Sequence, residues 1–286
     1  MKLAAAPISW GVSEVPDWGV QLPPGRVLAD MSRLGLGATE AGPPGFLPPD
    51  PGEARRLLTA NGLRLVGGFV TAVLHDPAIR ASELASVERQ ARWLADGGAE
   101  VLVLAAATGR AGYSAGEELS EDEWRALIDG IDRVAEVASR RGLAVAVHPH
   151  FGTAIERPRH VERLLERSAH PLCLDTGHLA LGGADPVAVA RDAGPRVRHV
   201  HLKDVDARLA AQVREGTLAY AQGVRQGLYV ALGEGAARVR EVLALLRATG
   251  YAGWYVLEQD VMLDRTPEDG PPAWIERSLA FAKRHA

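Results

Sequence analysis

Short runs of apolar residues alternate with longer amphipathic segments from one end of the chain to the other. Eight runs have the length of strands, and several are almost uninterrupted in their apolar character, as strands buried on both faces are. The strands predicted in this way are 2–6, 38–41, 64–70, 100–106, 143–148, 171–175, 197–203 and 254–258. The pattern between them, with apolar residues at i, i+3 and i+4, predicts helices.

End signals support these helices. Ser120 and Glu123 form a capping box ahead of one apolar stripe, which Gly142 closes. Asp50 and Asp185 each precede a proline, which is typical of a helix start. Eight strands, each followed by a helical segment, predict the α/β fold class and a single (β/α)8 TIM barrel, with residues 1–286 forming one catalytic domain.

Three segments are longer than ordinary loops, namely 9–24, 42–51 and 205–235. Each follows a predicted strand and therefore belongs to the barrel face where active sites are built. The last segment holds a glycine-rich patch around Glu234. This patch is interpreted either as a lid or substrate clamp, with Glu234 binding substrate, or as a surface excursion or subunit contact.

Composition narrows the function classes. Apolar residues make up 47% of the 286 residues and charged residues 24%, which is enough for a large core and a soluble surface. A net charge of −4 and the absence of any Lys/Arg run argue against a nucleic-acid or membrane-surface protein. The single cysteine, Cys173, fits a reducing cytoplasm and is expected in the core. With no signal peptide or membrane span evident, we expect a cytoplasmic protein.

Candidate chemistry lies where four consecutive predicted strands end. These ends carry His148 and His150, then Asp175, then His201 and Lys203, and finally Glu258. The carboxyl ends of neighbouring parallel strands meet at one edge, so these side chains are expected to converge. Imidazole and carboxylate groups together suit one divalent cation, and the sequence therefore predicts a metal site.

Three neighbouring positions are assigned supporting roles. We expect His199 to point toward the helix layer and to be structural. Asp204 is expected to orient His201. Lys203 is interpreted either as a catalytic base or as the partner of Asp204 or Glu258 in a salt bridge.

Two residues at earlier strand ends are substrate-binding candidates. Trp10 would form an apolar wall against a ring-shaped substrate, with plain packing as the alternative. Glu40 would bind a substrate hydroxyl or support the metal site, with an ordinary loop carboxylate as the alternative.

Several motifs carry a family resemblance over nearly the whole chain. They are PISWGVSEVPDWGVQLPP, HPHFGT, DTGHLALGGADP, HVHLKDV, GEG and GYAGWYVLEQD. The chain resembles the xylose isomerase-like superfamily of sugar isomerases, epimerases and dehydratases, a barrel also used by endonuclease IV. Within it, the motifs are similar to the inosose (2-keto-myo-inositol) dehydratase branch, which acts in inositol catabolism.

The resemblance implies a ligand set and a reaction. It places the metal on Asp175, His201 and Glu258, and makes His178 the substrate-contacting histidine. Mn²⁺ or Co²⁺ is favoured, and Zn²⁺, Fe²⁺ and Mg²⁺ are compatible. At the fifth strand this chain has His148, with His150 two residues further on, where many of the isomerases have a glutamate ligand. Either histidine is in a position to reach the metal.

That departure bears on mechanism, because the isomerases shuttle a proton between two opposed, metal-bound glutamates. A site with one of them missing suits dehydration of a keto-cyclitol or keto-sugar by β-elimination through a metal-stabilised enolate. In this interpretation Lys203 or His150 removes the proton beside the ketone. His178 protonates the departing hydroxide.

Three alternatives remain at this point. An isomerase or epimerase acting on a free ketose would use the same metal. A phosphodiesterase for damaged DNA would need a basic surface and a second ligand cluster, neither of which is evident. A non-catalytic barrel would serve as a partner or sensor. The expected partner is a small polyhydroxy ketone, with no nucleic acid and no membrane, and a homo-oligomer is compatible with the sequence.

Overall fold

Eight parallel strands close into a barrel in the computed structural model, which describes residues 1–110, 118–267 and 271–285. The strands are β1 (Lys2–Ala5), β2 (Ala38–Glu40), β3 (Arg64–Ala72), β4 (Val101–Ala106), β5 (Ala144–Val147), β6 (Leu172–Asp175), β7 (Val197–Leu202) and β10 (Trp254–Leu257). Their order is β1-β10-β7-β6-β5-β4-β3-β2, and β1 pairs in parallel with both β2 and β10. The predicted (β/α)8 barrel is therefore confirmed.

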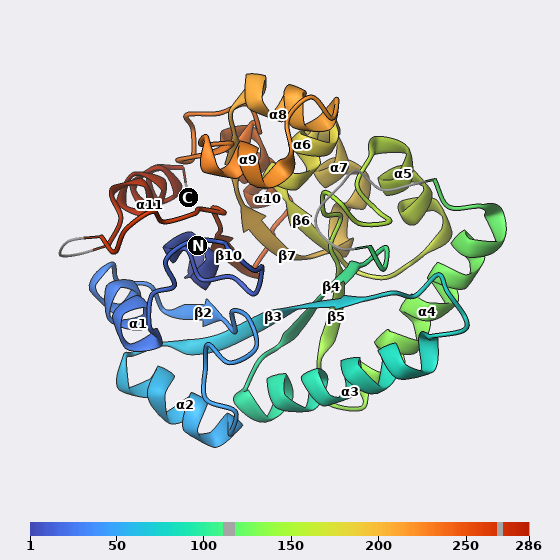
Figure 1. The fold of residues 1–286 in the computed structure, drawn as a ribbon, viewed down its shortest axis with the longest axis horizontal. Coiled ribbons are helices and arrows are strands. Elements are labelled where there is room, and N and C mark those ends of the chain that lie inside the picture. The colour runs from blue at the N-terminus through green and yellow to red at the C-terminus, as the bar shows by residue number, and fades with distance from the viewer. Residues whose placement is uncertain (111–117, 268–270, 286) are drawn as a thin grey trace.

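Helices surround this barrel, as Figure 1 shows for α2, α3 and α4 outside β3 and β4. The helices of the described residues are α1 (Pro24–Arg33), α2 (Pro51–Ala60), α3 (Arg80–Gly97), α4 (Glu121–Ser139), α5 (Pro158–Arg167), α6 (Thr176–Gly182), α7 (Pro186–Ala193), α8 (Ala207–Arg214), α9 (Tyr220–Arg225), α10 (Val239–Ala248) and α11 (Ala273–Arg284). The capping box of Ser120 and Glu123 opens α4 as predicted. Asp50 and Asp185 cap α2 and α7.

The barrel interior is filled by small side chains. Ala4, Ala38, Val66 and Val256 form one cluster. Cys173 belongs to another, with Val101, Val103 and Ala146. Its thiol is fully buried, and burial raises its pKa to about 11. The larger apolar side chains lie in the layer between strands and helices, so small residues leave the barrel axis narrow and well packed.

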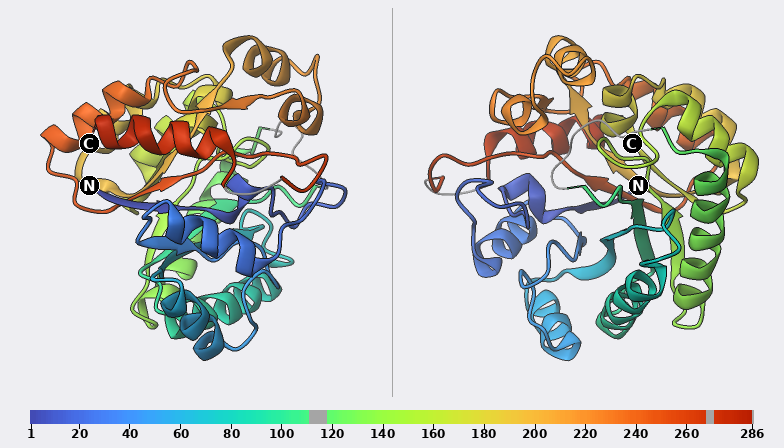
Figure 2. Two further views of the ribbon diagram at one scale, coloured as in Figure 1. Left: turned by 90° about the vertical axis from the view of Figure 1, so that its left-hand side faces the viewer. Right: turned by 45° about the vertical axis from the view of Figure 1, so that its right-hand side comes forward.

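The long segment after β7 folds into a small subdomain. It consists of α8 and α9, flanked by the antiparallel pair β8 (Asp204–Val205) and β9 (Tyr229–Val230). In the left view of Figure 2 this orange segment stands at the end of the barrel opposite the N-terminus, where the carboxyl ends of the strands lie. None of the described helices combines the length and the apolar character needed to cross a membrane.

A close contact between α6 and the loop before α5 gives a stability prediction. A Cβ at Gly182 would overlap the carbonyl oxygen of Glu156, whereas a Cβ at Gly25, also in a helix, would meet nothing within 4 Å. We expect Gly182→Ala to lower the free energy of unfolding by about 1–3 kcal/mol through overpacking. Gly25→Ala, the matched control, should be neutral or stabilising by about 0.4–1 kcal/mol. Urea denaturation of both variants checks this; equal stabilities would contradict the packing argument.

Candidate metal centre and catalytic cavity

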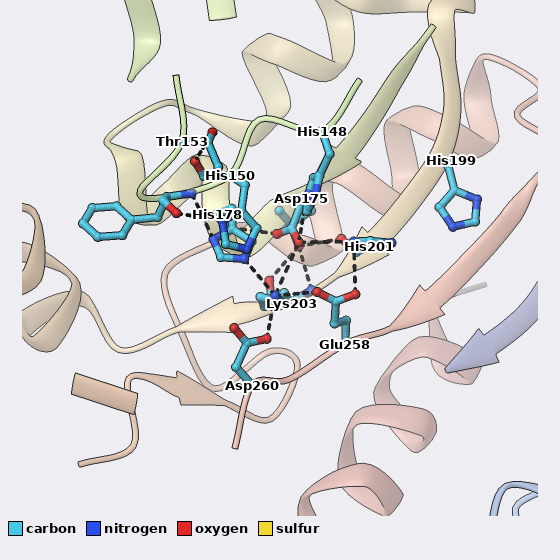
Figure 3. Close-up of polar contacts among 12 residues, drawn as sticks. His148, His150, Thr153, Asp175, His178, His199, His201, Lys203, Glu258 and Asp260 are labelled. Carbon is cyan, nitrogen blue, oxygen red and sulfur yellow. Dashed lines mark hydrogen bonds and ion pairs between the residues drawn. The ribbon is translucent and has the colours of Figure 1, made fainter. Parts of the chain in front are cut away.

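Donor atoms from three neighbouring strands converge at the barrel mouth. The Nδ1 atom of His201 lies 3.5 Å from Oδ2 of Asp175 and 3.1 Å from Oε2 of Glu258. Donors that each lie 2.0–2.2 Å from one tetrahedral ion are about 3.3–3.6 Å apart, so these separations suit a shared cation. Figure 3 shows the three side chains pointing toward one another.

Asp175 holds two parts of this region together. Its Oδ1 accepts the backbone N–H of His178 at 2.7 Å and thereby caps α6. Its Oδ2 faces His148 and His201 and lies 3.6 Å from Nζ of Lys203. Burial alone would raise the pKa of Asp175, but Lys203 and then His178 outweigh it, and the pKa falls well below its ordinary value. The carboxylate is therefore ionised.

The two histidines after β5 differ in their surroundings. Nε2 of His148 lies 3.3 Å from Oδ2 of Asp175, beside the convergent donors. His150 instead donates from Nδ1 to the carbonyl of Phe151 at 2.7 Å. Burial lowers the pKa of His148 to about 4 and that of His150 well below 6.5. Both are therefore neutral, and this tautomer of His150 carries its lone pair on Nε2.

Glu40 supports His201 from across the barrel mouth. Its Oε1 lies 3.0 Å from Nε2 of His201 and 2.8 Å from Nε2 of His199. Burial alone would raise the pKa of Glu40, but His201 and His199 lower it well below its ordinary value. The Nε2–H of His201 thus donates to the Glu40 carboxylate, and its Nδ1 faces Asp175 and Glu258. Glu40 thus contacts His201 and also lines the cavity, and both its expected support of a metal site and its expected contact with substrate stay predictions.

The expectation for His199 is wrong. Side chains on a strand alternate with a period of two, so His199 shares the face of His201 and points into the barrel. It lies one layer deeper, paired in register with Cys173, while His201 is paired with Asp175. In Figure 3 it stands to one side of the other polar groups.

Lys203 is the most connected group of the site. Its ammonium donates to Glu258 at 2.6 Å and to Asp260 at 2.8 Å, and lies 3.0 Å from Nε2 of His178. Burial would lower its pKa, but Asp260, Glu258 and Asp175 raise it well above the ordinary value. Burial likewise raises the pKa of Glu258, against the pull of His201 and Lys203. Lys203 is therefore held as a cation, which disfavours its predicted role as the base.

Local packing explains how a fully buried lysine is accommodated. Its backbone N–H donates to the hydroxyl of Thr176, and that hydroxyl donates to the Lys203 carbonyl at 2.6 Å. The aliphatic chain lies against Gly177, where a Cβ would overlap it. A glycine after Asp-Thr therefore makes room for this cation.

Three contributors to the site were missed by sequence reasoning. Asp260 follows Glu258 by two residues and so shares its direction, a signal that was present in the sequence. Its other oxygen accepts the hydroxyl of Tyr220 at 2.7 Å, and Tyr220 contacts the hydroxyl of Tyr229 at 3.1 Å. Both tyrosines come from the subdomain after β7, and no local sequence pattern indicates where their side chains point.

Three predicted residues are not brought to the site. Trp10 is fully buried among the apolar core residues, and its indole N–H donates to Asp30 at 3.2 Å. It does not continue the direction of β1, because the chain turns into the 3-10 helix Pro7–Trp10 after the strand. Glu234 pairs with Arg277 on the surface, with 48% of its side chain exposed. The predicted contact of Asp204 with His201 is also wrong, because its carboxylate instead accepts backbone N–H groups of Gly233, Gly235 and Ala237.

An open cavity of about 590 Å³ lies above these groups. Glu40, His150, Tyr220, Glu258 and Asp260 form its inner polar wall. The N-terminal loop around Trp18, strand β3 and helix α3 form the rest. His178 and Lys203 lie behind this wall, and the rings of His178 and His150 are 3.6 Å apart.

The donor set fits a divalent cation on two observations. The buried Nδ1 atom of His201 has no hydrogen bond within the described part of the chain, although it lies 3.1 Å from Glu258 and 3.5 Å from Asp175. Three candidate donor groups also occur there, each with its donor atoms within 4.8 Å of one another: His148–Cys173–His201, Glu40–His199–His201 and Asp175–His178–Glu258. Glu40 of the second group and Glu258 of the third line the cavity. His201 belongs to the first two groups and lies within 3.5 Å of Asp175 and Glu258 of the third. Mixed imidazole and carboxylate donors suit first-row divalent metals.

Comparison with known proteins identifies the family. A model of the xylose isomerase-like TIM barrel matches residues 28–285. The chain belongs to this family. An inosose dehydratase of Geobacillus thermodenitrificans (strain NG80-2) is 30% identical over 275 residues, covering 91% of this chain and 90% of the relative. The rhizopine catabolism protein MocC of Rhizobium meliloti is 31% identical over 268 residues, covering 91% and 82%.

Solved structures share the fold of this chain. The probable 3-DHS dehydratase AsbF of Bacillus anthracis gives a TM-score of 0.73 at 17% identity, covering 99% of this chain and 98% of that one. The 3-keto-D-glucoside 4-epimerase YcjR of E. coli gives a TM-score of 0.70 at 18% identity, covering 99% of both. The barrel of this family therefore extends over nearly the entire chain.

Burial of neutral imidazoles predicts a pH dependence of stability. Burial lowers the pKa of His148, His150, His178 and His199 below 6.5, and that of His148 to about 4. The unfolded chain binds protons at these positions as the pH falls through about 6.5, while the folded chain does not. Their stabilising contribution, present above pH 6.5, should therefore be lost toward pH 4, by about 1.4 kcal/mol per pH unit for each histidine.

Denaturant unfolding of the metal-free protein between pH 7 and pH 4.5 measures this effect. His201 does not oppose it: burial would lower its pKa, but neighbouring charges including Glu258 and Glu40 raise it well above 6.5. The stabilising contribution of His201 is therefore fully present below pH 6.5 and is lost only at higher pH. The variant His199→Asn should show a shallower loss. A free energy of unfolding that stays constant over this range would rule the argument out.

Proposed function

We propose that the protein is a divalent-metal-dependent lyase that dehydrates a keto-cyclitol or a related keto-sugar by β-elimination, with residues 1–286 acting as one catalytic domain. The observation that carries the proposal is the convergence of Asp175, His201 and Glu258 beneath a cavity whose wall presents the neutral imidazole of His150. The relative named inosose dehydratase, which aligns with 91% of the chain, supports this substrate class.

The residues that would hold the cation are Asp175, His201 and Glu258, with His148 as the fourth donor. When bound, a divalent ion supplies Lewis-acid stabilisation for the negative charge that develops on a ketone oxygen. Glu40 fixes the orientation and tautomer of His201. Mn²⁺ and Co²⁺ remain our preferred metals.

His150 is the base that we assign to the proton beside the ketone. Its Nδ1–H is used by the carbonyl of Phe151, so the lone pair is on Nε2, and the side chain lines the cavity. Its lowered pKa keeps the imidazole unprotonated at neutral pH. Lys203, the other candidate, is held as an ammonium by Glu258 and Asp260.

The departing hydroxyl needs a proton, and two donors are connected to the site. His178 is backed by Lys203, whose ammonium lies 3.0 Å from its Nε2, but it sits behind His150. Tyr220 lines the cavity and is oriented by Asp260 at 2.7 Å. We therefore assign Tyr220 as the group that donates its O–H proton to the leaving oxygen, giving up its hydrogen bond to Asp260. The Lys203–His178 pair replaces this proton through Tyr229, whose hydroxyl lies 3.4 Å from Nδ1 of His178 and 3.1 Å from the hydroxyl of Tyr220.

The residue at the fifth strand favours elimination over isomerisation. Proton exchange between two faces of a substrate needs two bases of similar strength on opposite sides. Here β5 is followed by His148, which is neutral and turned toward Asp175, and by His150. The two histidines therefore do not form a pair of bases on opposite sides of a substrate, which favours elimination. An isomerase or epimerase of free ketoses is the second candidate.

Solvent deuterium separates these two reactions. Incubation of the metal-loaded protein with 2-keto-myo-inositol in deuterated water should give a conjugated enone or diketone absorbance. The carbon beside the ketone loses a proton and the next carbon loses hydroxide, which forms a double bond between them. Absorbance spectroscopy and mass spectrometry follow both products. Deuterium exchange into a recovered isomer, without any new absorbance, would replace the lyase assignment with the isomerase.

Removal of a metal ligand should abolish metal binding and turnover together. We expect Asp175→Asn to weaken metal binding by at least about 100-fold while it keeps an oxygen to cap α6. Asp185→Asn, which changes the cap of α7 outside the site, is the matched control and should bind metal normally. Isothermal titration with Mn²⁺ and a turnover assay measure both effects. A fully active Asp175→Asn or His201→Ala variant would remove the proposed centre.

A further inference from the structure

A second cavity of about 290 Å³ lies beside the catalytic one, between the segment 41–49 and helix α3. Its walls include Leu47, Val70, Trp93 and Leu94, and Gln90 is its one polar side chain apart from the indole N–H of Trp93. That N–H is bonded to the carbonyl of Pro49 at 3.0 Å, which ties α3 to the opposite wall. A concave apolar space with satisfied polar groups suits an apolar ligand group.

One aromatic ring separates this apolar cavity from the reactive imidazoles. Phe69 lines both cavities. Its ring lies 5.8 Å from that of His148, edge to face, and 5.5 Å from that of His150. Gln90 and residues 42–44 also line both cavities. A substituent on a substrate held at His150 therefore has a short path past Phe69 into the apolar space.

The catalytic cavity is also larger than one ring requires. Its volume is about 590 Å³. A bare keto-cyclitol has only about twelve non-hydrogen atoms, which is smaller than the drug-sized ligands that cavities of this volume usually enclose. Such a ring would therefore fill only part of this cavity. The unfilled part extends along β3 toward Ser86 and Gln90 of α3, which is the direction of the apolar cavity.

We propose that the substrate carries an apolar substituent, an alkyl or aryl group linked to the ring through oxygen, and that this group binds in the cavity walled by Leu47, Phe69, Trp93 and Leu94. The proposal rests on the proposed function in one respect, because that function places the ring at His150. Phe69 then forms the platform between the polar ring and its apolar substituent. The site is selective for substituted over unsubstituted ketones.

A series of keto-inositol ethers tests this assignment. The probes are 2-keto-myo-inositol and its O-methyl, O-propyl and O-hexyl ethers, with binding measured by isothermal titration and kcat/KM by absorbance, both on the metal-loaded protein. We expect the dissociation constant to fall about fourfold for each methylene buried, until the cavity is full. A dissociation constant that does not change with chain length overturns the proposal.

A filling variant and a matched control locate the effect. Gln90→Trp places a large side chain at the junction of the two cavities and should abolish the chain-length dependence of the dissociation constant, which is compared among the ketone and its ethers bound to the same variant. Arg92→Trp, on the exposed side of the same helix, should retain the dependence. Loss of the dependence in both variants, or in neither, overturns the assignment to this cavity.

Binding and turnover distinguish the two proposals. Turnover of the ketones with flat chain-length dependence overturns the apolar subsite and leaves the lyase standing. Chain-length-dependent binding without turnover of any probe supports the subsite and overturns the lyase. Because binding is measured separately, the subsite is tested even if the reaction has been assigned wrongly.

Discussion

The pairing of buried charges around Asp175 is the constraint on which this site depends. One oxygen of the carboxylate ends β6 by capping α6, and the other faces His148, His201 and Lys203. An unpaired charge at this depth would cost several kcal/mol, so each buried acid requires a base close by. The glycine beside Lys203 follows from the same requirement, because a bulkier residue would displace the cation from its carboxylates.

Barrel closure turns this pairing into a three-dimensional network. In the strand order, β1 and β10 separate β2 from β7, yet Glu40 at the end of β2 reaches His201 and His199 of β7 through the barrel interior. The subdomain after β7 adds Tyr220 and Tyr229, which contact Asp260 and the ring of His178. The barrel therefore supplies donors fixed by strand register, while the subdomain supplies groups that complete the cavity.

The outer half of the site follows a different physical rule. Near Asp175 the side chains are polar and tightly paired, whereas beyond Phe69 the walls are apolar and shaped by prolines and α3. A ligand that is polar at one end and apolar at the other would satisfy both regions. Its polar end would meet groups already oriented by Glu40, Asp260 and the Phe151 carbonyl, so little ordering would be required on binding.

Residues that lie on strands were predicted well because the period of two and the barrel face follow directly from sequence. His148, Asp175, His201 and Glu258 were placed at one mouth for this reason. The same period, applied consistently, would have turned His199 inward and found Asp260. Of the two interpretations of Trp10, the structure bears out plain packing, because a 3-10 turn interrupts the strand direction. Asp204 was misplaced because its partners are backbone N–H groups of a loop folded back onto it.

By itself, the sequence determined the eight-stranded barrel, the helix caps and the set of donors at its mouth, because each depends on local periodicity or on neighbours within a few residues. Tertiary structure alone decided that Glu40 fixes His201, that Lys203 remains a cation, and that Tyr220 rather than His178 reaches the cavity. These outcomes depend on burial and on distances between segments that are far apart in the chain. The local sequence pattern determines neither quantity.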